Sequence, residues 1–153
     1  MSAEQRLKEL GITLPPQTTP IGNYVPWRIG AGLLFLSGVG PQQTDPSFPA
    51  GQVTRELSLE QGYQAARLCG MALLGNMRAA LGSLDRVEAV LKVFGMVNAP
   101  AGFTQQPKVI NGCTDLFVEV LGETGRPARS AVGMGSLPGN IATEIEAIVL
   151  IRD

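Results

Sequence analysis

The spacing of apolar side chains along the chain predicts two long helices. Ser58 and Gln61 are placed to form a capping box, in which each side chain binds a backbone N–H at the start of a helix. Apolar residues follow at helical spacing as far as Gly82, which suits the left-handed conformation that ends many helices. A second apolar stripe starts near Pro107, a residue favoured in the first helical turn, and ends at Gly122.

Three glycines lie inside the first of these helices, at Gly62, Gly70 and Gly75. Each glycine costs a helix about 1 kcal/mol relative to alanine. We therefore expect them to serve close packing of the helix against a sheet.

Runs rich in β-branched and apolar residues predict the strands. Residues 33–36 form a short apolar strand, and 87–97 predict a central strand with Val87, Ala89, Leu91 and Val93 on one face. Segments 128–136 and 141–151 flank a Leu-Pro-Gly-Asn turn and predict a hairpin. The order of elements predicts an α+β fold with two helices on one face of a sheet.

The length of the chain predicts a single domain over residues 1–153. Residues 1–18 form an N-terminal extension of that domain. Within it, residues 2–10 predict a short helix that ends at Gly11, before the two consecutive prolines at 15 and 16.

Charge and composition narrow the classes of function. Twelve Lys and Arg residues face thirteen Asp and Glu residues, and only 16% of the chain is charged. This low charge suits a subunit that covers part of its surface with copies of itself. The net charge of −1 and an aromatic content of 5% argue against a nucleic-acid partner.

The distribution of apolar and charged residues bears on the cellular location of the protein. No apolar run approaches the roughly 20 residues of a membrane span, so no membrane partner is expected. Residues 1–10 carry charges throughout and do not resemble a signal peptide. We therefore expect a cytoplasmic protein that acts on a small molecule.

The absence of histidine excludes every mechanism that needs an imidazole, including the common catalytic triads and zinc sites. Cys69 and Cys113 are too few to form a zinc cage, so we expect no metal and no cofactor. Both cysteines fall in predicted helices, where buried reduced thiols are usual. A disulfide between them would need α-carbons within about 7 Å, which the sequence leaves open.

Three charged residues stand out in the C-terminal strands. Arg129 lies in an otherwise apolar strand, while Glu144 and Glu146 share one face of the next because side chains alternate. A hairpin would place Arg129 opposite Ile148 and on the same face as both glutamates, with Glu144 roughly 13 Å away. Charges in a sheet need a partner or a ligand. Arg129 therefore either forms an ion pair with Glu146 or binds a ligand, and it meets Glu144 only across a subunit boundary.

These residues belong to a recognisable pattern. The C-terminal blocks GRPARSAV at 125–132, LP at 137–138 and IEAI at 145–148 resemble the signature of the YjgF/YER057c/UK114 family, also called the Rid family. The resemblance extends from about residue 20 to the end of the chain. Weaker matches occur in the family's order at GNY (22–24), LFLSG (34–38) and VING (109–112).

The resemblance implies a chorismate-mutase-like α+β fold, a mixed sheet with two helices packed on one face, in a homotrimer with clefts between subunits. In the deaminase branch of the family, water hydrolyses the C=N bond of a 2-imino acid and releases ammonia and a 2-oxo acid. By resemblance, Arg129 is the catalytic residue that grips the substrate carboxylate, a role suited to a bidentate guanidinium. Glu144 would orient the attacking water, and Tyr24, Ser37 and Asn111 would line the cleft and bind the substrate.

Two departures from the deaminase branch indicate an outlying subgroup. That branch commonly has a cysteine two residues after the arginine, where this chain has Ala131. The segment 98–107 is also longer, which could displace Asn111 and leave Asn98 as a less favoured substitute.

Alternatives stay open at the level of the sequence. Tyr24 could be a half-buried strand aromatic, Ser37 a turn residue and Asn111 a surface helix residue. The protein could be an imine hydrolase or a non-catalytic trimer that binds small carboxylates. An endoribonuclease is less favoured, because the charge is balanced and histidine is absent.

Overall fold

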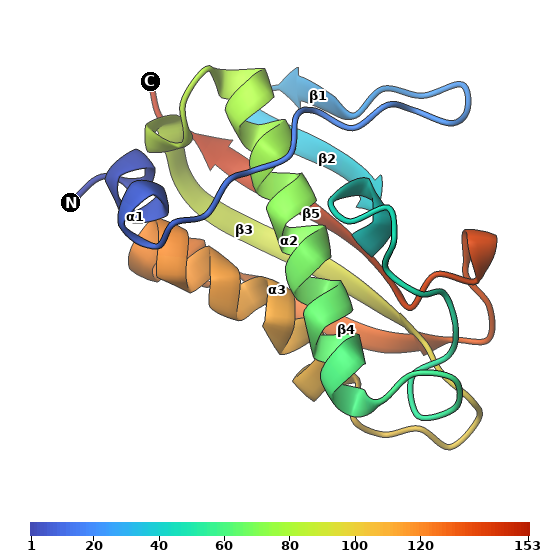
Figure 1. Cartoon of the computed structure of the whole chain (residues 1–153). Coiled ribbons are helices and arrows are strands. Elements are labelled where there is room, and N and C mark those ends of the chain that lie inside the picture. The colour runs from blue at the N-terminus through green and yellow to red at the C-terminus, as the bar shows by residue number, and fades with distance from the viewer.

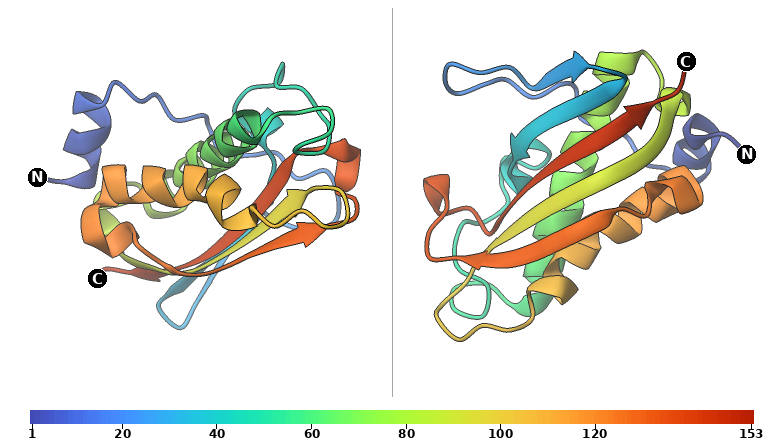
Figure 2. Two further views of the ribbon diagram at one scale, coloured as in Figure 1. Left: turned by 90° about the horizontal axis from the view of Figure 1, so that it is seen from below. Right: turned by 180° about the vertical axis from the view of Figure 1, so that it is seen from behind.

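A mixed sheet forms the base of the fold, and two long helices lie side by side across one of its faces (Figures 1 and 2). The computed structural model describes all 153 residues. The strands follow the order β1-β2-β5-β3-β4 across the sheet. Their bounds are β1 Trp27–Gly30, β2 Leu33–Val39, β3 Val87–Asn98, β4 Ala128–Met134 and β5 Thr143–Ile151. The helices are α1 Ala3–Glu9, α2 Leu59–Leu81 and α3 Gln106–Leu121. The predicted α+β class, with two helices on one face of the sheet, is confirmed.

The two long helices begin and end where the sequence predicts. Ser58 Oγ accepts a hydrogen bond from the backbone N–H of Gln61 at 3.0 Å, and Gln61 Oε1 accepts one from Ser58 at 2.9 Å. Gly82 ends α2 with a φ of 83°, in the left-handed region that favours glycine. α3 starts one residue before Pro107 and ends at Leu121, with Gly122 as the residue that caps it.

The glycines of α2 do allow close packing, but the predicted partner was wrong. A methyl group at Gly70 would lie 3.1 Å from the Leu116 side chain of α3, and one at Gly75 would meet the carbonyl oxygen of Pro15. These glycines therefore bring α3 and the N-terminal segment close to α2, rather than the sheet. Sequence spacing shows that a helix has a small-residue face, but not which element covers it.

The N-terminal segment is fastened to the outer side of α2, which it crosses between α1 and β1 (Figure 1). Asn76 on α2 is fully buried. Its Oδ1 accepts a hydrogen bond from the Thr18 backbone N–H at 2.9 Å, and its Nδ2 donates to Thr18 Oγ1 at 3.1 Å. One side chain thus holds the segment that leads into the first strand.

We expect Asn76→Ala to destabilise the protein by about 1–3 kcal/mol, because the buried Thr18 N–H loses its acceptor. For a chain of this size, the melting temperature should fall by roughly 2–4 °C per kcal/mol. Thermal denaturation measures the change. Thr18→Ser is the matched control, since it keeps both polar groups and should melt close to the wild type. Equal melting temperatures for all three proteins would contradict the fastening role.

The predicted hairpin between the last two strands does not form. β3 lies between them: β4 pairs in parallel with one edge of β3, and β5 pairs antiparallel with the other. The reason is α3, which crosses back over the sheet and delivers β4 beside β3 as a parallel neighbour. Pro138–Asn140 then form a short 3₁₀ turn in a wider connection.

The alternation predicted for β3 is also interrupted. Val87, Val90 and Val93 are buried, whereas Leu91 is 41% exposed. The register between β3 and β5 shifts between Val87 and Ala89 and again between Val90 and Lys92. Such irregularities change which side chains face the core.

The face of the sheet away from the helices is uncovered in the single chain, as the view from behind shows (Figure 2). Phe35 on β2 is 44% exposed on this face, and Phe94 and Ile148 lie only half-buried on β3 and β5. None of the helices combines the length and the apolar character that crossing a membrane requires.

Candidate functional site

Arg129, the second residue of β4, points toward the helix layer. It pairs with Val93 of β3, which pairs in turn with Ala147 of β5, and both of these side chains are buried under the helices. The guanidinium Nη1 donates to Asn111 Oδ1 at 2.8 Å and to Thr114 Oγ1 at 3.0 Å, and Nη2 donates to the Pro107 carbonyl at 3.4 Å. All three acceptors are neutral. The ion pair with Glu146 that the hairpin register allowed does not form.

Helix geometry explains how α3 holds this arginine. Asn111 and Thr114 are three residues apart, so their side chains lie on the same face of the helix. The N–H of Nε and one N–H of Nη2 have no acceptor within the chain. These adjacent nitrogens can bind both oxygens of a carboxylate in parallel hydrogen bonds. The recess beside them has a volume of about 350 Å³ and is lined by Asn111, Thr114, Asp115, Val118, Arg126, Pro127 and Arg129.

Glu144 lies on the opposite face of the sheet from Arg129. It pairs with Met96, and Glu146 pairs with Phe94, so both carboxylates point to the uncovered face. β4 and β5 lie two strand spacings apart, and Glu144 lies three residues along β5 from the residue level with Arg129, so their backbones are separated by roughly 14 Å. The prediction that these three charged residues share one face was therefore wrong, because it rested on the hairpin. The two glutamates do share a face.

The carboxylate of Glu144 has no hydrogen-bond partner or ion pair in the chain. Burial is the main cause that raises its pKa above the ordinary value, and the negative charge of Glu146 adds to the effect. A half-buried carboxylate without a partner needs a cation, a donor or a water molecule to bind.

Glu144 forms one wall of a second recess together with Tyr24 and Ser37. The Ser37 hydroxyl donates to the Val25 carbonyl at 2.6 Å, and the Tyr24 hydroxyl accepts from the Ile21 N–H at 3.3 Å. This cleft has a volume of about 600 Å³. Its lining residues are Ile21, Tyr24, Ser37, Gly38, Gly40, Gln42, Gln43, Pro138, Gly139, Ile141 and Glu144. The predicted site residues thus divide into an arginine recess, with Arg129 and Asn111, and a glutamate cleft, with Tyr24, Ser37 and Glu144.

The longer segment before α3 does not displace Asn111, because Asn111 contacts Arg129 directly. Asn98, the less favoured substitute, is buried and donates to Asn140 Oδ1 at 2.9 Å and to the Ile141 carbonyl at 3.1 Å. It holds the turn that forms part of the wall of the glutamate cleft. Ala131 lies two residues beyond Arg129 and on the same face of β4.

Sequence reasoning missed two residues at these recesses. Thr114 is the second side-chain partner of Arg129, and its spacing of three from Asn111 was the signal that could have revealed it. Gln42 lines the glutamate cleft. Its Nε2 donates to the Phe48 carbonyl at 2.9 Å, which leaves its buried Oε1 without a partner. No pattern in the sequence indicates Gln42.

The two cysteines are free and buried in α2 and α3, as predicted. Burial raises the pKa of the Cys69 thiol to about 12 and that of Cys113 well above its ordinary value. Neither thiol is a nucleophile at neutral pH, because the reactive species is the thiolate.

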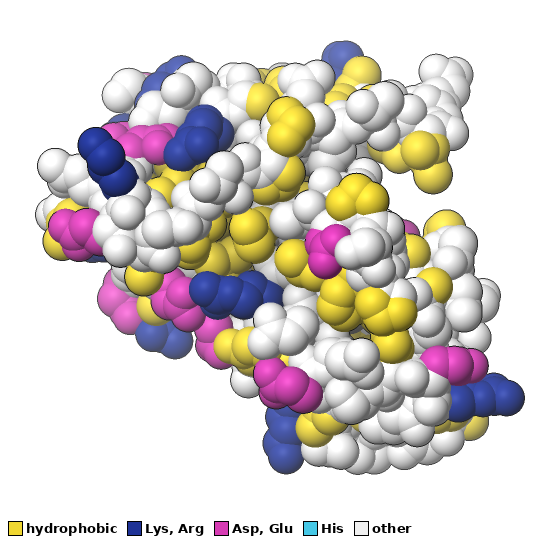
Figure 3. All heavy atoms as spheres, viewed as in Figure 1, with side chains coloured by type: hydrophobic (Ala, Val, Ile, Leu, Met, Phe, Trp, Pro, Cys, Tyr) yellow, Lys and Arg dark blue, Asp and Glu magenta, His cyan; other side chains and the backbone are white.

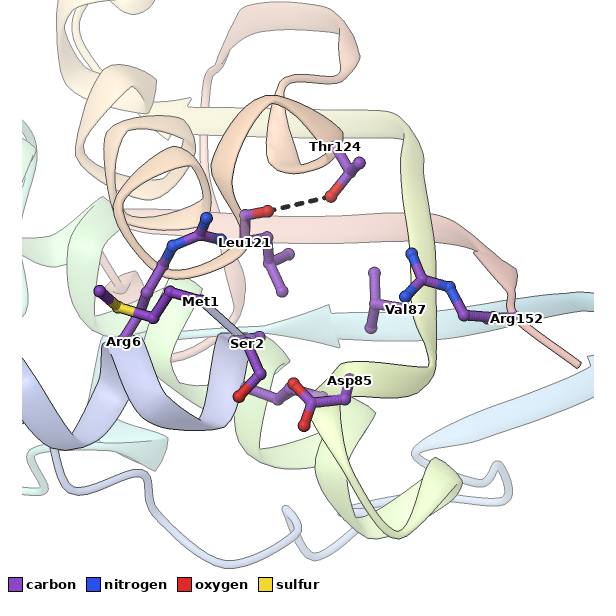
Figure 4. A pocket seen from close by; sticks show the side chains of 10 residues that line it. Met1, Ser2, Arg6, Asp85, Val87, Leu121, Thr124 and Arg152 are labelled. Atoms are coloured by element: carbon purple, nitrogen blue, oxygen red, sulfur yellow. Dashed lines mark hydrogen bonds between the residues drawn. The ribbon is translucent and has the colours of Figure 1, made fainter.

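A further recess lies where the two termini meet, bounded by α1, the start of β3 and the end of α3 (Figure 4). Its volume is about 310 Å³. Arg152 points into this region but pairs with Glu88 at 2.6 Å, and Arg6 donates to the Val120 carbonyl at 3.5 Å. No predicted site residue lines it, so it is not the candidate site.

Comparison with known proteins places the chain in a family. The model of the family described as "YjgF/chorismate_mutase-like, putative endoribonuclease" matches residues 4–146. The chain belongs to this family. The resemblance to the YjgF/YER057c/UK114 (Rid) family and the chorismate-mutase-like fold are thereby confirmed.

Several individual proteins match nearly the whole chain. Protein TCP17 of Trypanosoma cruzi is 41% identical over 148 residues, which cover 96% of this chain and 92% of that protein. The crystal structure of Atu1372 from Agrobacterium tumefaciens, a protein of unknown function, is 44% identical with a TM-score of 0.89, over 97% of this chain and 92% of that one. RidA from the Antarctic bacterium Psychrobacter is 26% identical with a TM-score of 0.62, and the match covers 91% of this chain and 97% of RidA. The chain is thus similar to RidA in fold but closer in shape to Atu1372.

Proposed function

We propose that this protein is a hydrolase that converts 2-imino acids into 2-oxo acids and ammonia. The observation that carries the proposal is the state of Arg129. Its guanidinium is held by three neutral acceptors, has no carboxylate partner, and keeps two adjacent nitrogens with free N–H groups at an open recess. A fixed, unneutralised guanidinium of this kind is suited to bind the carboxylate of a small metabolite.

The complete site requires more than one copy of the chain. Arg129 and Glu144 lie on opposite faces of one sheet, so a single chain cannot direct both at one small molecule. We propose that copies assemble as a homotrimer, in which the arginine recess of one subunit faces the glutamate cleft of the next. The exposed apolar residues of the uncovered face favour such an assembly. Size-exclusion chromatography with light scattering measures the oligomeric state, and a monomer would contradict this part of the proposal.

The reaction follows from the chemistry of the two recesses. Arg129 binds the substrate carboxylate, and Glu144 accepts a proton from a water molecule whose oxygen attacks the carbon of the C=N bond. Glu144 passes that proton to the imine nitrogen, which gives a carbinolamine, and the carbinolamine hydroxyl gives up its proton to the same nitrogen as the C–N bond breaks. The nitrogen leaves as ammonia, Glu144 is again ionised, and the carbon becomes the carbonyl of a 2-oxo acid. One water is consumed for each ammonia released, and no cofactor enters the balance.

An imine assay tests the proposal. An amino-acid oxidase generates 2-imino acids in solution, and their disappearance is followed with and without the protein. We expect the protein to accelerate hydrolysis. Saturable binding of 2-oxo acids without acceleration would instead indicate a non-catalytic carboxylate-binding protein. No feature specifically favours RNA cleavage, since basic and acidic side chains are interspersed on the face shown in Figure 3.

The pH profile of the reaction should report on Glu144. Burial and Glu146 raise its pKa, and only the ionised form can accept a proton, so kcat/KM should fall as the pH drops through that raised value. Glu146→Gln removes one of the two causes and should move the acid limb to lower pH. Glu88→Gln, an exposed glutamate paired with Arg152, is the control and should leave the profile unchanged. An identical acid limb in Glu146→Gln would show that Glu144 is not the titrating group.

A further inference from the structure

The recess where the two termini meet, which we call the terminal recess, has a guanidinium group on each side. Arg6 on α1 and Arg152, the residue after β5, come from opposite sides of it (Figure 4). Each guanidinium makes one contact within the chain: Arg6 Nη1 donates a long hydrogen bond to the Val120 carbonyl at 3.5 Å, and Arg152 Nε donates to Glu88 at 2.6 Å. The other N–H groups of both arginines have no acceptor in the chain. Both guanidinium groups can therefore still donate to an anion.

The surface between the two arginines is apolar. Leu121 and Val87 lie between the guanidinium groups (Figure 4), and Leu84 and Met1 add further apolar surface to the lining. The volume of about 310 Å³ is at the lower end of the range for pockets that bind small molecules. Two cationic ends with an apolar stretch between them match a molecule that has a carboxylate at each end and methylene groups in the middle.

The chain does not supply carboxylates of its own for this arrangement. Asp85 is the one acidic residue in the lining. Its Oδ1 accepts a hydrogen bond from the Glu4 backbone N–H at 3.2 Å, and it forms no ion pair with either arginine. Ser2 adds a donor, because its Oγ accepts from the Gln5 N–H at 3.2 Å while its own hydroxyl proton has no acceptor in the chain.

We propose that the terminal recess binds a small linear dicarboxylate, with one carboxylate on Arg6, the other on Arg152, and the methylene groups against Leu121 and Val87. The site shares no lining residue with the arginine recess or the glutamate cleft, so this proposal is independent of the proposed hydrolase. A ligand held in this way bridges α1 and the end of β5. It should therefore raise the melting temperature of the protein as its concentration rises.

Calorimetric titration with glutarate and with pentanoate tests the proposal, since the two probes have five carbons but differ by one carboxylate. The full chain is used without an N-terminal tag, because Met1 and Ser2 line the recess. Glutarate should bind at least about tenfold more tightly than pentanoate, through the hydrogen bonds of its second carboxylate. Arg6→Gln and Arg152→Gln should each weaken glutarate binding by about tenfold or more. Lys8→Gln is the matched control, because it removes an exposed charge of α1 that lies outside the recess.

A third variant separates this site from the arginine recess, where Arg129 is also suited to bind a carboxylate. Glutarate binding that persists in Arg129→Gln and is lost in Arg6→Gln or Arg152→Gln assigns the ligand to the terminal recess. Arg152 is exposed, so its variant decides the question even if Arg6→Gln loosens α1. Binding lost only in Arg129→Gln, equal affinities for glutarate, pentanoate and inorganic phosphate, or no binding of glutarate would each overturn the proposal.

Discussion

Arg129→Lys should lower kcat/KM for imine hydrolysis by about 100-fold or more. The variant keeps the positive charge but loses the planar fork, which alone can donate to Asn111 and Thr114 while presenting two parallel hydrogen bonds to a carboxylate. Hydrogen bonds to charged groups contribute about 1.5–3 kcal/mol each. Losing about 3 kcal/mol from the transition state corresponds to roughly a 100-fold decrease in rate. The measurement is the steady-state rate of imine loss over a range of substrate concentrations.

The control for this prediction is Arg152→Lys. Arg152 is an exposed arginine whose carboxylate partner, Glu88, a lysine can also reach, and it lies outside both recesses of the proposed site. Its variant should hydrolyse imines at the wild-type rate. If Arg129→Lys retained more than a tenth of the wild-type kcat/KM, charge alone would explain the role of Arg129 and the bidentate interaction would be rejected.

Local structure could be predicted from the sequence because its causes are local. The capping box at Ser58, the left-handed glycine at 82 and the apolar stripe of α3 each act within a few residues, and all three occur in the structure. Strand pairing could not be predicted in the same way. A turn-rich segment at 137–140 is compatible with a hairpin, but β3 forms hydrogen bonds along both edges and separates β4 from β5.

The candidate site shows the same limit. Arg129 and Glu144 stand out from the strand pattern alone, whereas Tyr24, Ser37 and Asn111 came from the family resemblance. Arg129 contacts Asn111 from neighbouring positions on β4 and α3. The faces on which Arg129 and Glu144 lie depend on how β3, β4 and β5 pair. Because the hairpin prediction paired β4 directly with β5, it placed Arg129 on the wrong face of the sheet. Gln42 and the apolar walls of the glutamate cleft lie in loops. The hydrophobic periodicity of the sequence does not show that these loops come together.

Gly112→Ala should be among the most destabilising single-methyl substitutions in the chain. Gly112 lies on α3, where an added Cβ would lie well inside van der Waals contact with the carbonyl oxygen of Tyr63 and 3.0 Å from the backbone nitrogen of Arg67, both on α2. Backbone atoms cannot rotate away as side chains do, so the two helices must separate. Inserting a methyl group into a well-packed core costs about 1–3 kcal/mol and occasionally more. This cost exceeds the roughly 1 kcal/mol that alanine gains over glycine inside a helix.

Gly70→Ala is the matched control for this prediction, because Gly70 is also a buried helical glycine at the interface of α2 and α3. A methyl group at Gly70 would meet the flexible end of Leu116 at 3.1 Å and Cα and Sγ of Cys113 at 3.3 Å, farther than the backbone contacts at Gly112, so Gly70→Ala should cost clearly less than Gly112→Ala. Chemical denaturation of both variants gives their free energies of unfolding, and a Gly112→Ala protein as stable as the wild type would contradict the close approach of the helices. Gly112 also lies between Asn111 and Thr114, the two side chains that hold Arg129. Separating α3 from α2 should therefore displace the guanidinium, so that the folded fraction of Gly112→Ala hydrolyses imines more slowly than Gly70→Ala at equal concentration.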